Sequence, residues 1–327
     1  MRAVVAREAG GPEVLDVVEL DDPRPGPGQL LVRVAAAGLN FIDTYRRSGG
    51  YPLEFPHVVG SEGAGEVVEL GPDTTGFAVG DRVSWDNALG SYAELALVPA
   101  ANAIRLPAGM DLTTAAALPL QGITAHYLVR STFEVGPGHD VLLHAGAGGV
   151  GLLATQLADA QGARVITTVG SAAKAELSRA AGASDVIDYS QFSDLSTELP
   201  AAVKDLTGGA GVHVVYDGVG KATFDASLAS LRRRGMLVLF GGASGQVPPF
   251  QIQRLNSGGS LYLTRPSIGH YTATREELEW RMAELLERVM EGTLNVRIGA
   301  TYPLEQAADA HRALEGRQTT GKVLLLP

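Results

Sequence analysis

The chain has 327 residues, 45% of them hydrophobic, and a formal net charge of −10 at pH 7. It is too long for one small core and too apolar for a disordered protein, so we expect two domains. The absence of cysteine excludes disulfides and thiolate metal ligands. The negative charge argues against nucleic acid and anionic lipid as partners.

No apolar run approaches the roughly 18 residues that a membrane span requires. Charged Arg7 and Glu8 lie where a signal peptide would be apolar. We therefore expect no membrane partner, and the cytoplasm is the default location.

The first roughly 110 residues consist of short β-like runs separated by glycine and proline, such as "LLVRVAAAGL", "GAGEVVELG" and "SYAELALV". This texture predicts a β-rich domain over residues 1–122. The C-terminal tail, which adds a helix and a closing strand, is expected to return to it. Residues 267–327 are therefore assigned to the same domain.

From about residue 123, strands alternate with helices, a pattern that indicates parallel βαβ units. The strands are "VLLHA", "ARVITTV", "SDVIDY", "VHVVYDGV", "GMLVLFG" and "SLYLTRP". Residues 123–266 are thus predicted to form a doubly wound parallel sheet, the Rossmann architecture. The run "RRR" at 232–234 is interpreted as a solvated helix end. Beyond the sheet, Thr274 and Glu277 have capping-box spacing at the start of the clearest helix.

The stretch "HAGAGGVG" carries glycines with the spacing of a dinucleotide fingerprint, between a strand and a helix. Only glycine lets the backbone approach a pyrophosphate closely, and the next helix offers free amides and a positive dipole end. A turn that only reverses the chain is the alternative interpretation. The residues assigned to cofactor binding here are Gly146, Gly148, Gly149, Val150 and Gly151.

The second strand of this domain ends "TTVGSAAK", without the acidic residue that NAD-preferring sites place against the ribose hydroxyls. Gly170 leaves space, Ser171 can donate a hydrogen bond, and Lys174 supplies a positive charge. NADPH is therefore predicted rather than NADH. The alternative is that Ser171 only caps its helix and Lys174 is a solvated surface charge.

The order of a β-rich domain and a dinucleotide-binding domain resembles the medium-chain dehydrogenase/reductase superfamily, whose first domain is GroES-like. The segment "VVGSEGAGEVVELG" is similar to its glycine-rich segment. In the zinc alcohol dehydrogenases of that superfamily, a histidine and a cysteine bind the catalytic metal. Ser61 stands at the histidine position, and the chain has no cysteine. The histidines also include no HExxH pattern and no pair at helix-face spacing, so no metal site is expected.

Within the superfamily, the chain resembles the zinc-free quinone oxidoreductases, the zeta-crystallin-like branch. The motifs "AAAGLNFIDTYRRSGGYP", "HAGAGGVG", "VVYDGVG" and "LYLTRPS" carry this resemblance in order. It implies NADPH-dependent reduction of a quinone or another electron-poor acceptor by a homodimer or homotetramer. Two alternatives stay open: reduction of the C=C bond of alkenals and enones, and a non-catalytic NADPH-binding, crystallin-like role.

The resemblance also implies site residues. Asn40, Asp43, Tyr45 and Tyr51 would line the nicotinamide and acceptor side, where the tyrosines offer flat apolar faces. Asn40 and Tyr45 are also assigned to the cofactor. Packing at a domain edge is the alternative for both tyrosines. Tyr45, Asp43 and an ordered water are candidate proton donors. The remaining cofactor assignments are Thr124, Tyr189, Phe240, Gly241, Gly242, Thr264 and Arg317.

Overall fold

The structure is a computed structural model that describes residues 1–327. The chain folds as two compact units, Met1–Ile123 with Thr272–Pro327, and Thr124–Tyr271. The second boundary lies at Tyr271 rather than at the expected Pro266. Helix α9 (Ile268–Tyr271) stays with the second unit, where the Tyr271 ring stacks on Tyr127 with centroids 4.4 Å apart. No helix combines the length and apolar character needed to cross a membrane.

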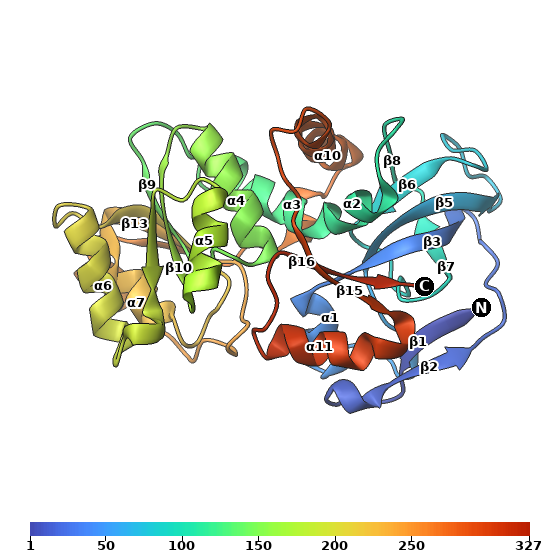
Figure 1. The fold of residues 1–327 in the computed structure, drawn as a ribbon, viewed down its shortest axis with the longest axis horizontal. Coiled ribbons are helices and arrows are strands. Elements are labelled where there is room, and N and C mark those ends of the chain that lie inside the picture. The colour runs from blue at the N-terminus through green and yellow to red at the C-terminus, as the bar shows by residue number, and fades with distance from the viewer. The chain divides into compact units, whose positions relative to one another are not determined.

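The second unit is built on a six-stranded parallel sheet in the order β11-β10-β9-β12-β13-β14. Helices α4 and α5 lie on one side of it and α6 and α7 on the other (Figure 1). With both faces covered, the central strands β9, β10 and β12 are almost wholly buried. The elements are β9 (Asp140–Leu143), α4 (Gly149–Ala160), β10 (Arg164–Val169), α5 (Ala172–Ala180), β11 (Asp185–Asp188), α6 (Leu195–Leu206), β12 (Val212–Asp217), α7 (Phe224–Ala229), β13 (Leu231–Leu239), α8 (Gln253–Ser257) and β14 (Tyr262–Thr264).

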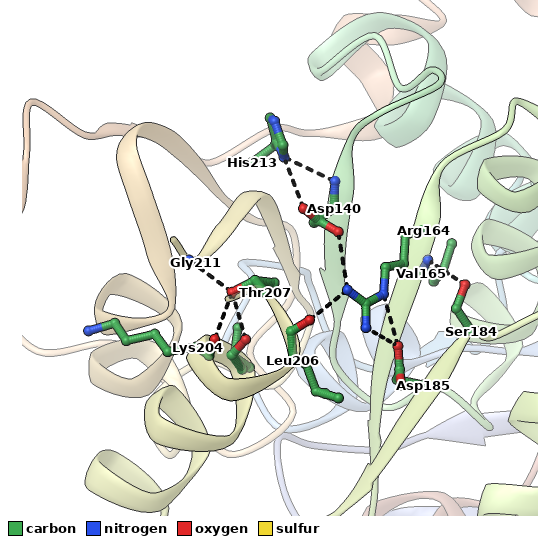
Figure 2. A network of polar contacts seen from close by, with 11 residues as sticks. Asp140, Arg164, Val165, Ser184, Asp185, Lys204, Leu206, Thr207, Gly211 and His213 are labelled. Carbon is green, nitrogen blue, oxygen red and sulfur yellow. Dashed lines mark hydrogen bonds and ion pairs between the residues drawn. The ribbon is translucent and has the colours of Figure 1, made fainter. Parts of the chain in front are cut away.

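The strand order reverses between β9 and β12, and at such a point the carboxyl ends of parallel strands open a crevice for ligands. At the amino ends of β9, β10 and β11, ion pairs connect neighbouring strands (Figure 2). Arg164 Nη2 lies 2.9 Å from Asp185 Oδ2, Arg164 Nη1 lies 3.8 Å from Asp140 Oδ1, and Nη1 donates to Leu206 O at 2.6 Å. Side chains therefore link the strands at their amino ends, and the glycine turn lies at their carboxyl ends.

The first unit contains a seven-stranded sheet and a three-stranded sheet. Six strands of the larger sheet follow the order β15-β16-β3-β5-β6-β8, and the seventh, β7, pairs with β3. Trp85, Leu30 and Val32 lie in its core. The tail joins the large sheet because β16 pairs with β3. The elements are β1 (Arg2–Ala6), β2 (Leu15–Glu19), β3 (Gln29–Leu39), α1 (Phe41–Arg47), β4 (His57–Val58), β5 (Glu62–Leu70), β6 (Arg82–Trp85), β7 (Leu95–Pro99), β8 (Ile104–Arg105), α2 (Leu112–Ala117), α10 (Arg275–Met290), β15 (Ile298–Pro303), α11 (Ala307–Glu315) and β16 (Lys322–Leu326). Helix α3 (Pro119–Tyr127) leads into the second unit.

The predicted fold class, a β-rich GroES-like part and a Rossmann sheet, is confirmed. Two details of the prediction are wrong. Residues 232–234 lie in strand β13 and not at a helix end, because the parallel pairing with β12 extends back to Leu231. The N-terminal region also contains helix α1, which begins at a reciprocal capping box between Asn40 and Asp43.

Candidate active site

The glycine turn follows β9 and needs glycine at two positions. Ala145 adopts a positive φ of 56°, and its carbonyl accepts a hydrogen bond from Gly148 N at 2.8 Å. A Cβ at Gly151 would lie 2.3 Å from that carbonyl oxygen. A Cβ at Gly146 would lie 2.6 Å from Thr167 Cβ. The missing side chains therefore permit both the tight turn and the close packing of the turn on β10.

Helix α4 begins at this turn, and no side chain caps its N-terminus, because the N-cap is Gly148. Gly148, Gly149 and Val150 are half-buried, so the first amides of the helix lie near the surface. Uncapped amides and the positive end of the helix dipole suit an anionic group. The turn thus fits a dinucleotide pyrophosphate.

Four of the residues assigned to cofactor binding, Gly170, Ser171, Lys174 and Tyr189, lie at the end of β10 and of the neighbouring strand β11. Ser171 Oγ accepts a hydrogen bond from Lys174 N at 3.4 Å, so Ser171 does cap α5. A Cβ on Gly170 would lie 3.1 Å from Tyr189 Oη, which places the tyrosine hydroxyl against the bare backbone at Gly170. An ammonium group on the first turn of α5 and two hydroxyl groups are suitable partners for a phosphate monoester.

A buried hydrogen-bond network lies at the carboxyl ends of the same strands, and it was not predicted from the sequence. The side chain of His144, which is 2% exposed, lies 2.9 Å from both Thr168 Oγ1 and Ser227 Oγ. Ser227 Oγ donates to Asp217 Oδ2 at 2.7 Å. Burial lowers the pKa of His144 and opposes protonation. The network connects residues at the carboxyl ends of β9, β10 and β12.

The other predicted residues of this unit follow β13 and β14 at the same edge. Phe240 N donates to Asp217 O at 2.8 Å, and a Cβ on Gly241 would lie 2.5 Å from Gly218 O. Thr264 closes β14 in register with Val238. Gly242 follows Gly241, and Thr124, which is 7% exposed, lies inside α3.

In the first unit, Asn40 and Asp43 belong to one buried polar cluster. Asp43 is 1% exposed and accepts hydrogen bonds from Asn40 N at 2.9 Å, Ser61 Oγ at 2.7 Å and Tyr92 Oη at 3.0 Å. Burial raises the pKa of the Asp43 carboxyl, against the opposing effect of these donors and of Arg46. Asp43 is thus held on all sides by protein groups.

An ion pair between Glu62 and Lys322 lies beside this cluster, and both side chains are buried. Asn40 donates to Glu62 Oε2 at 2.7 Å and accepts from Lys322 Nζ at 2.8 Å, and Glu62 Oε1 accepts from Leu120 N at 2.7 Å. Bare Gly38 makes room, because a Cβ there would lie 2.1 Å from Glu62 Oε2. Sequence reasoning did not assign this pair, although Glu62 follows Ser61 in a quoted motif. The pair fixes the orientation of the Asn40 side chain.

Tyr45 and Tyr51 form a small aromatic stack next to this cluster in sequence. The ring centroids of Tyr45 and Tyr51 are 6.1 Å apart, and the ring planes meet at 18°. The ring centroid of Phe41 lies 6.1 Å from that of Tyr45. Tyr51 is 40% exposed, so the stack presents a flat surface. Arg317 follows α11, is exposed and has a positive φ of 57°.

No three His, Cys, Asp or Glu side chains are grouped so that they could hold a metal ion. At the position where the zinc enzymes place a histidine, the Ser61 hydroxyl is occupied by Arg46 and Asp43. The Lys322 ammonium, a cation itself, binds the neighbouring carboxylate of Glu62. This donor set does not suit zinc, which takes thiolate, imidazole and free carboxylate ligands.

Two family models match the chain: the alcohol dehydrogenase GroES-like domain over residues 26–108 and the zinc-binding dehydrogenase over residues 149–288. The chain is 45% identical to a quinone oxidoreductase from Pseudomonas aeruginosa over 97% of both chains. It is 42% identical to a 2-haloacrylate reductase from Burkholderia, over 99% of this chain and 98% of that one. A mycobacterial structure complexed with NADPH is 51% identical and superposes over the whole of both chains with a TM-score of 0.97.

These similarities span both units. The chain belongs to the quinone oxidoreductase branch of the medium-chain dehydrogenase/reductase superfamily.

Proposed function

We propose that this protein uses NADPH to reduce quinones and related electron-poor acceptors, without a metal. The observation that carries the cofactor assignment is the turn itself, where an uncapped helix N-terminus meets a backbone with no room for a side chain at Gly151. Solved relatives that hold NADPH support it. When bound, the cofactor supplies a hydride from its nicotinamide ring.

In this proposal, different groups hold the pyrophosphate and the adenosine phosphate of the cofactor. Gly146, Gly148, Gly149, Val150 and Gly151 hold the pyrophosphate, while Gly170, Ser171, Lys174 and Tyr189 hold the adenosine phosphate. The further assigned contacts stay predictions; they are Phe240, Gly241, Gly242, Thr264, Thr124, Asn40 and Arg317. The absence of an acid after β10 favours a phosphate over bare ribose hydroxyls.

The acceptor is proposed to lie on the face formed by Tyr45 and Tyr51, whose stacked rings suit a planar, electron-poor ring. Asp43 accepts three hydrogen bonds in the interior, so we assign it a positioning role toward Asn40 and Ser61. Catalysis would come from proximity and exclusion of water, because the acceptor is already reactive. Tyr45 and water remain the candidate proton donors.

The lack of a Lewis acid shapes the substrate range that we propose. An unactivated carbonyl or alcohol needs a metal or a strong acid to polarise it, whereas a quinone or a conjugated alkene accepts hydride directly. The similarity to the 2-haloacrylate reductase from Burkholderia favours a second candidate, reduction of a C=C bond conjugated to an acid. Both candidates use the same cofactor site.

The decisive experiment is anaerobic NADPH oxidation by purified, chelator-treated protein. The panel contains a 1,4-benzoquinone, an ortho-quinone, an alkenal, an enone, a 2-haloacrylate, and an alcohol with NADP⁺ for the reverse direction. We expect chelator-resistant turnover of the quinones. Turnover of only the alkenes would replace quinone by alkene reduction. A rate that disappears on chelation would overturn the metal-free mechanism. NADPH binding without any turnover would indicate the non-catalytic role.

A further inference from the structure

Arg46 is hydrogen-bonded to the buried polar cluster that contains Asn40 and Asp43, although the motif in which it lies assigned it no role. Asp43 and Arg46 are three residues apart in α1 and therefore share a face of the helix. Arg46 Nη1 donates to Ser61 Oγ, and the Ser61 hydroxyl donates to Asp43 Oδ1. A chain of hydrogen bonds thus runs from a buried carboxylate, through a buried hydroxyl, to a guanidinium group.

The far end of this chain is accessible. Arg46 is only half-buried, whereas Asp43 and Ser61 are buried. A guanidinium has five N–H donors, and the bond to Ser61 is the only hydrogen bond that Arg46 makes within the protein. No carboxylate lies within ion-pair distance of it, in contrast to Arg47, which pairs with Glu315 at 2.7 Å. Arg46 therefore presents unused donors and a positive charge from a fixed position.

We propose that Arg46 is a specificity-determining residue that binds a negatively charged oxygen of the acceptor. This inference rests on the proposed function, because it places the acceptor beside Tyr45, the preceding residue of α1. A carboxylate matches the paired donors of a guanidinium, and anchoring on Ser61 reduces the entropy lost on binding. Unsaturated carboxylic acids are the substrate class that this geometry favours.

A second source of the same charge is the reaction itself. Reduction gives the acceptor a hydride, and with it two electrons, while the nicotinamide is oxidised. The negative charge collects on a conjugated oxygen of the acceptor until water supplies a proton. A fixed guanidinium would stabilise that charge as it develops. A permanent carboxylate and a developing oxyanion are distinguishable with matched substrates.

The test compares a 2-haloacrylate, its methyl ester and a neutral 1,4-benzoquinone, using wild type, Arg46→Met and Arg46→Lys. The control Arg7→Met removes an exposed guanidinium of the same unit that pairs with Asp16 outside the cluster. We expect Arg46→Met to lower kcat/KM for the acid by roughly tenfold to a hundredfold, the range for a charge-assisted hydrogen bond. Arg46→Lys should recover part of the loss, and Arg7→Met should have no effect.

The ester and the quinone identify the source of the charge. Unchanged values for both assign Arg46 to a permanent carboxylate, and a matching loss of kcat assigns it to the developing oxyanion. Acid, ester and quinone rates within twofold of wild type in Arg46→Met would overturn the proposal. Equal losses that follow a lower melting temperature, and that Arg46→Lys does not recover, would overturn it as well.

A binding measurement separates this inference from the proposed function. Calorimetry with benzoate and methyl benzoate, in the presence of NADP⁺, needs no turnover. We expect benzoate to bind more weakly to Arg46→Met than to wild type, with no change for the ester. If wild type reduces nothing on the panel but binds benzoate through Arg46, the reaction assignment fails and the anion site stands. Equal binding of benzoate by both proteins rejects the anion site.

Discussion

We propose that cofactor choice depends on a few side chains at the end of β10. Sequence alone left Ser171 and Lys174 open to a purely local role, and the structure shows that Ser171 does cap α5. The cap does not remove the second role, because a hydroxyl can accept one hydrogen bond and donate another. Tyr189, which the family resemblance also assigned to the cofactor, has its hydroxyl against Gly170. Together these groups could bind a phosphate that NADH lacks.

Replacing Lys174 by alanine should discriminate between the two nicotinamide cofactors. We expect Lys174→Ala to raise the NADPH dissociation constant by roughly tenfold to a hundredfold, because one charge-assisted hydrogen bond is lost. The NADH constant should stay almost unchanged. Fluorescence titration with both cofactors measures this, and Lys204→Ala, on an exposed position of α6, is the control. Equal weakening of both cofactors would remove the phosphate assignment.

At the scale of elements, the turn between β9 and α4 combines a geometric demand with the binding role that we propose for it. Its glycines were identified from spacing, and the structure supplies the reason at two of these positions. Gly146 lies against Thr167 and Ser178, and Gly151 lies against the carbonyl of Ala145. The network through His144, Ser227 and Asp217 fixes the strands that carry the turn. A side chain in the turn would therefore disturb both packing and the cofactor site.

Substituting alanine for Gly151 tests this demand. The new Cβ would lie 2.3 Å from a backbone oxygen, so the turn must shift, at a cost typical of overpacking, about 1–3 kcal/mol. We expect a lower free energy of unfolding in urea and weaker NADPH binding. Gly136→Ala is the matched control, because a Cβ there meets no atom within 4 Å. Wild-type binding by Gly151→Ala would mean that the turn does not hold the pyrophosphate.

At the scale of the whole molecule, the returning tail completes the first unit. It brings His311 of α11 to Arg47 of α1, where Arg47 Nη1 lies 3.0 Å from His311 Nδ1. Burial, and secondarily the charge of Arg47, lower the pKa of His311 to about 3. Glu315 also pairs with Arg47. A neutral buried histidine therefore connects two segments that are far apart in the sequence.

This histidine should make the stability of the protein dependent on pH. In the unfolded chain, His311 takes up a proton below its ordinary pKa of about 6.5, while the folded protein keeps it neutral down to about pH 3. Stability is therefore fully present above pH 6.5 and is lost as the pH falls through that window. The slope approaches about 1.4 kcal/mol per pH unit for one proton.

The variant His311→Gln retains an acceptor for Arg47 but cannot titrate. Urea unfolding of wild type and variant at several pH values between 7.5 and 4.5 gives the two slopes. We expect the free energy of unfolding of the variant to fall less steeply below pH 6.5. Parallel curves for the two proteins would show that His311 takes up its proton at the same pH in the folded and the unfolded chain, and would contradict its lowered pKa.

Features that depend on local pattern could be predicted from the amino-acid sequence. Apolar runs and glycine spacing predicted the six-stranded sheet, the turn after β9 and the return of the tail, and the motifs predicted the family. Helix α1 was missed because its seven residues lie between β-like runs. The arginines 232–234 were misplaced because an exposed strand start and a helix end have similar composition.

The contacts between side chains that are distant in the sequence depend on the folded chain. Lys322 reaches Glu62 because β16 pairs with β3, which also pairs with β5, and because bare Gly38 leaves space between them. Arg46 reaches Ser61 because α1 packs beside the start of β5. Such contacts depend on strand register and on burial, which turns a charged side chain toward the partner that offsets its desolvation. Local sequence carries no record of that partner, so these residues became visible only in the folded chain.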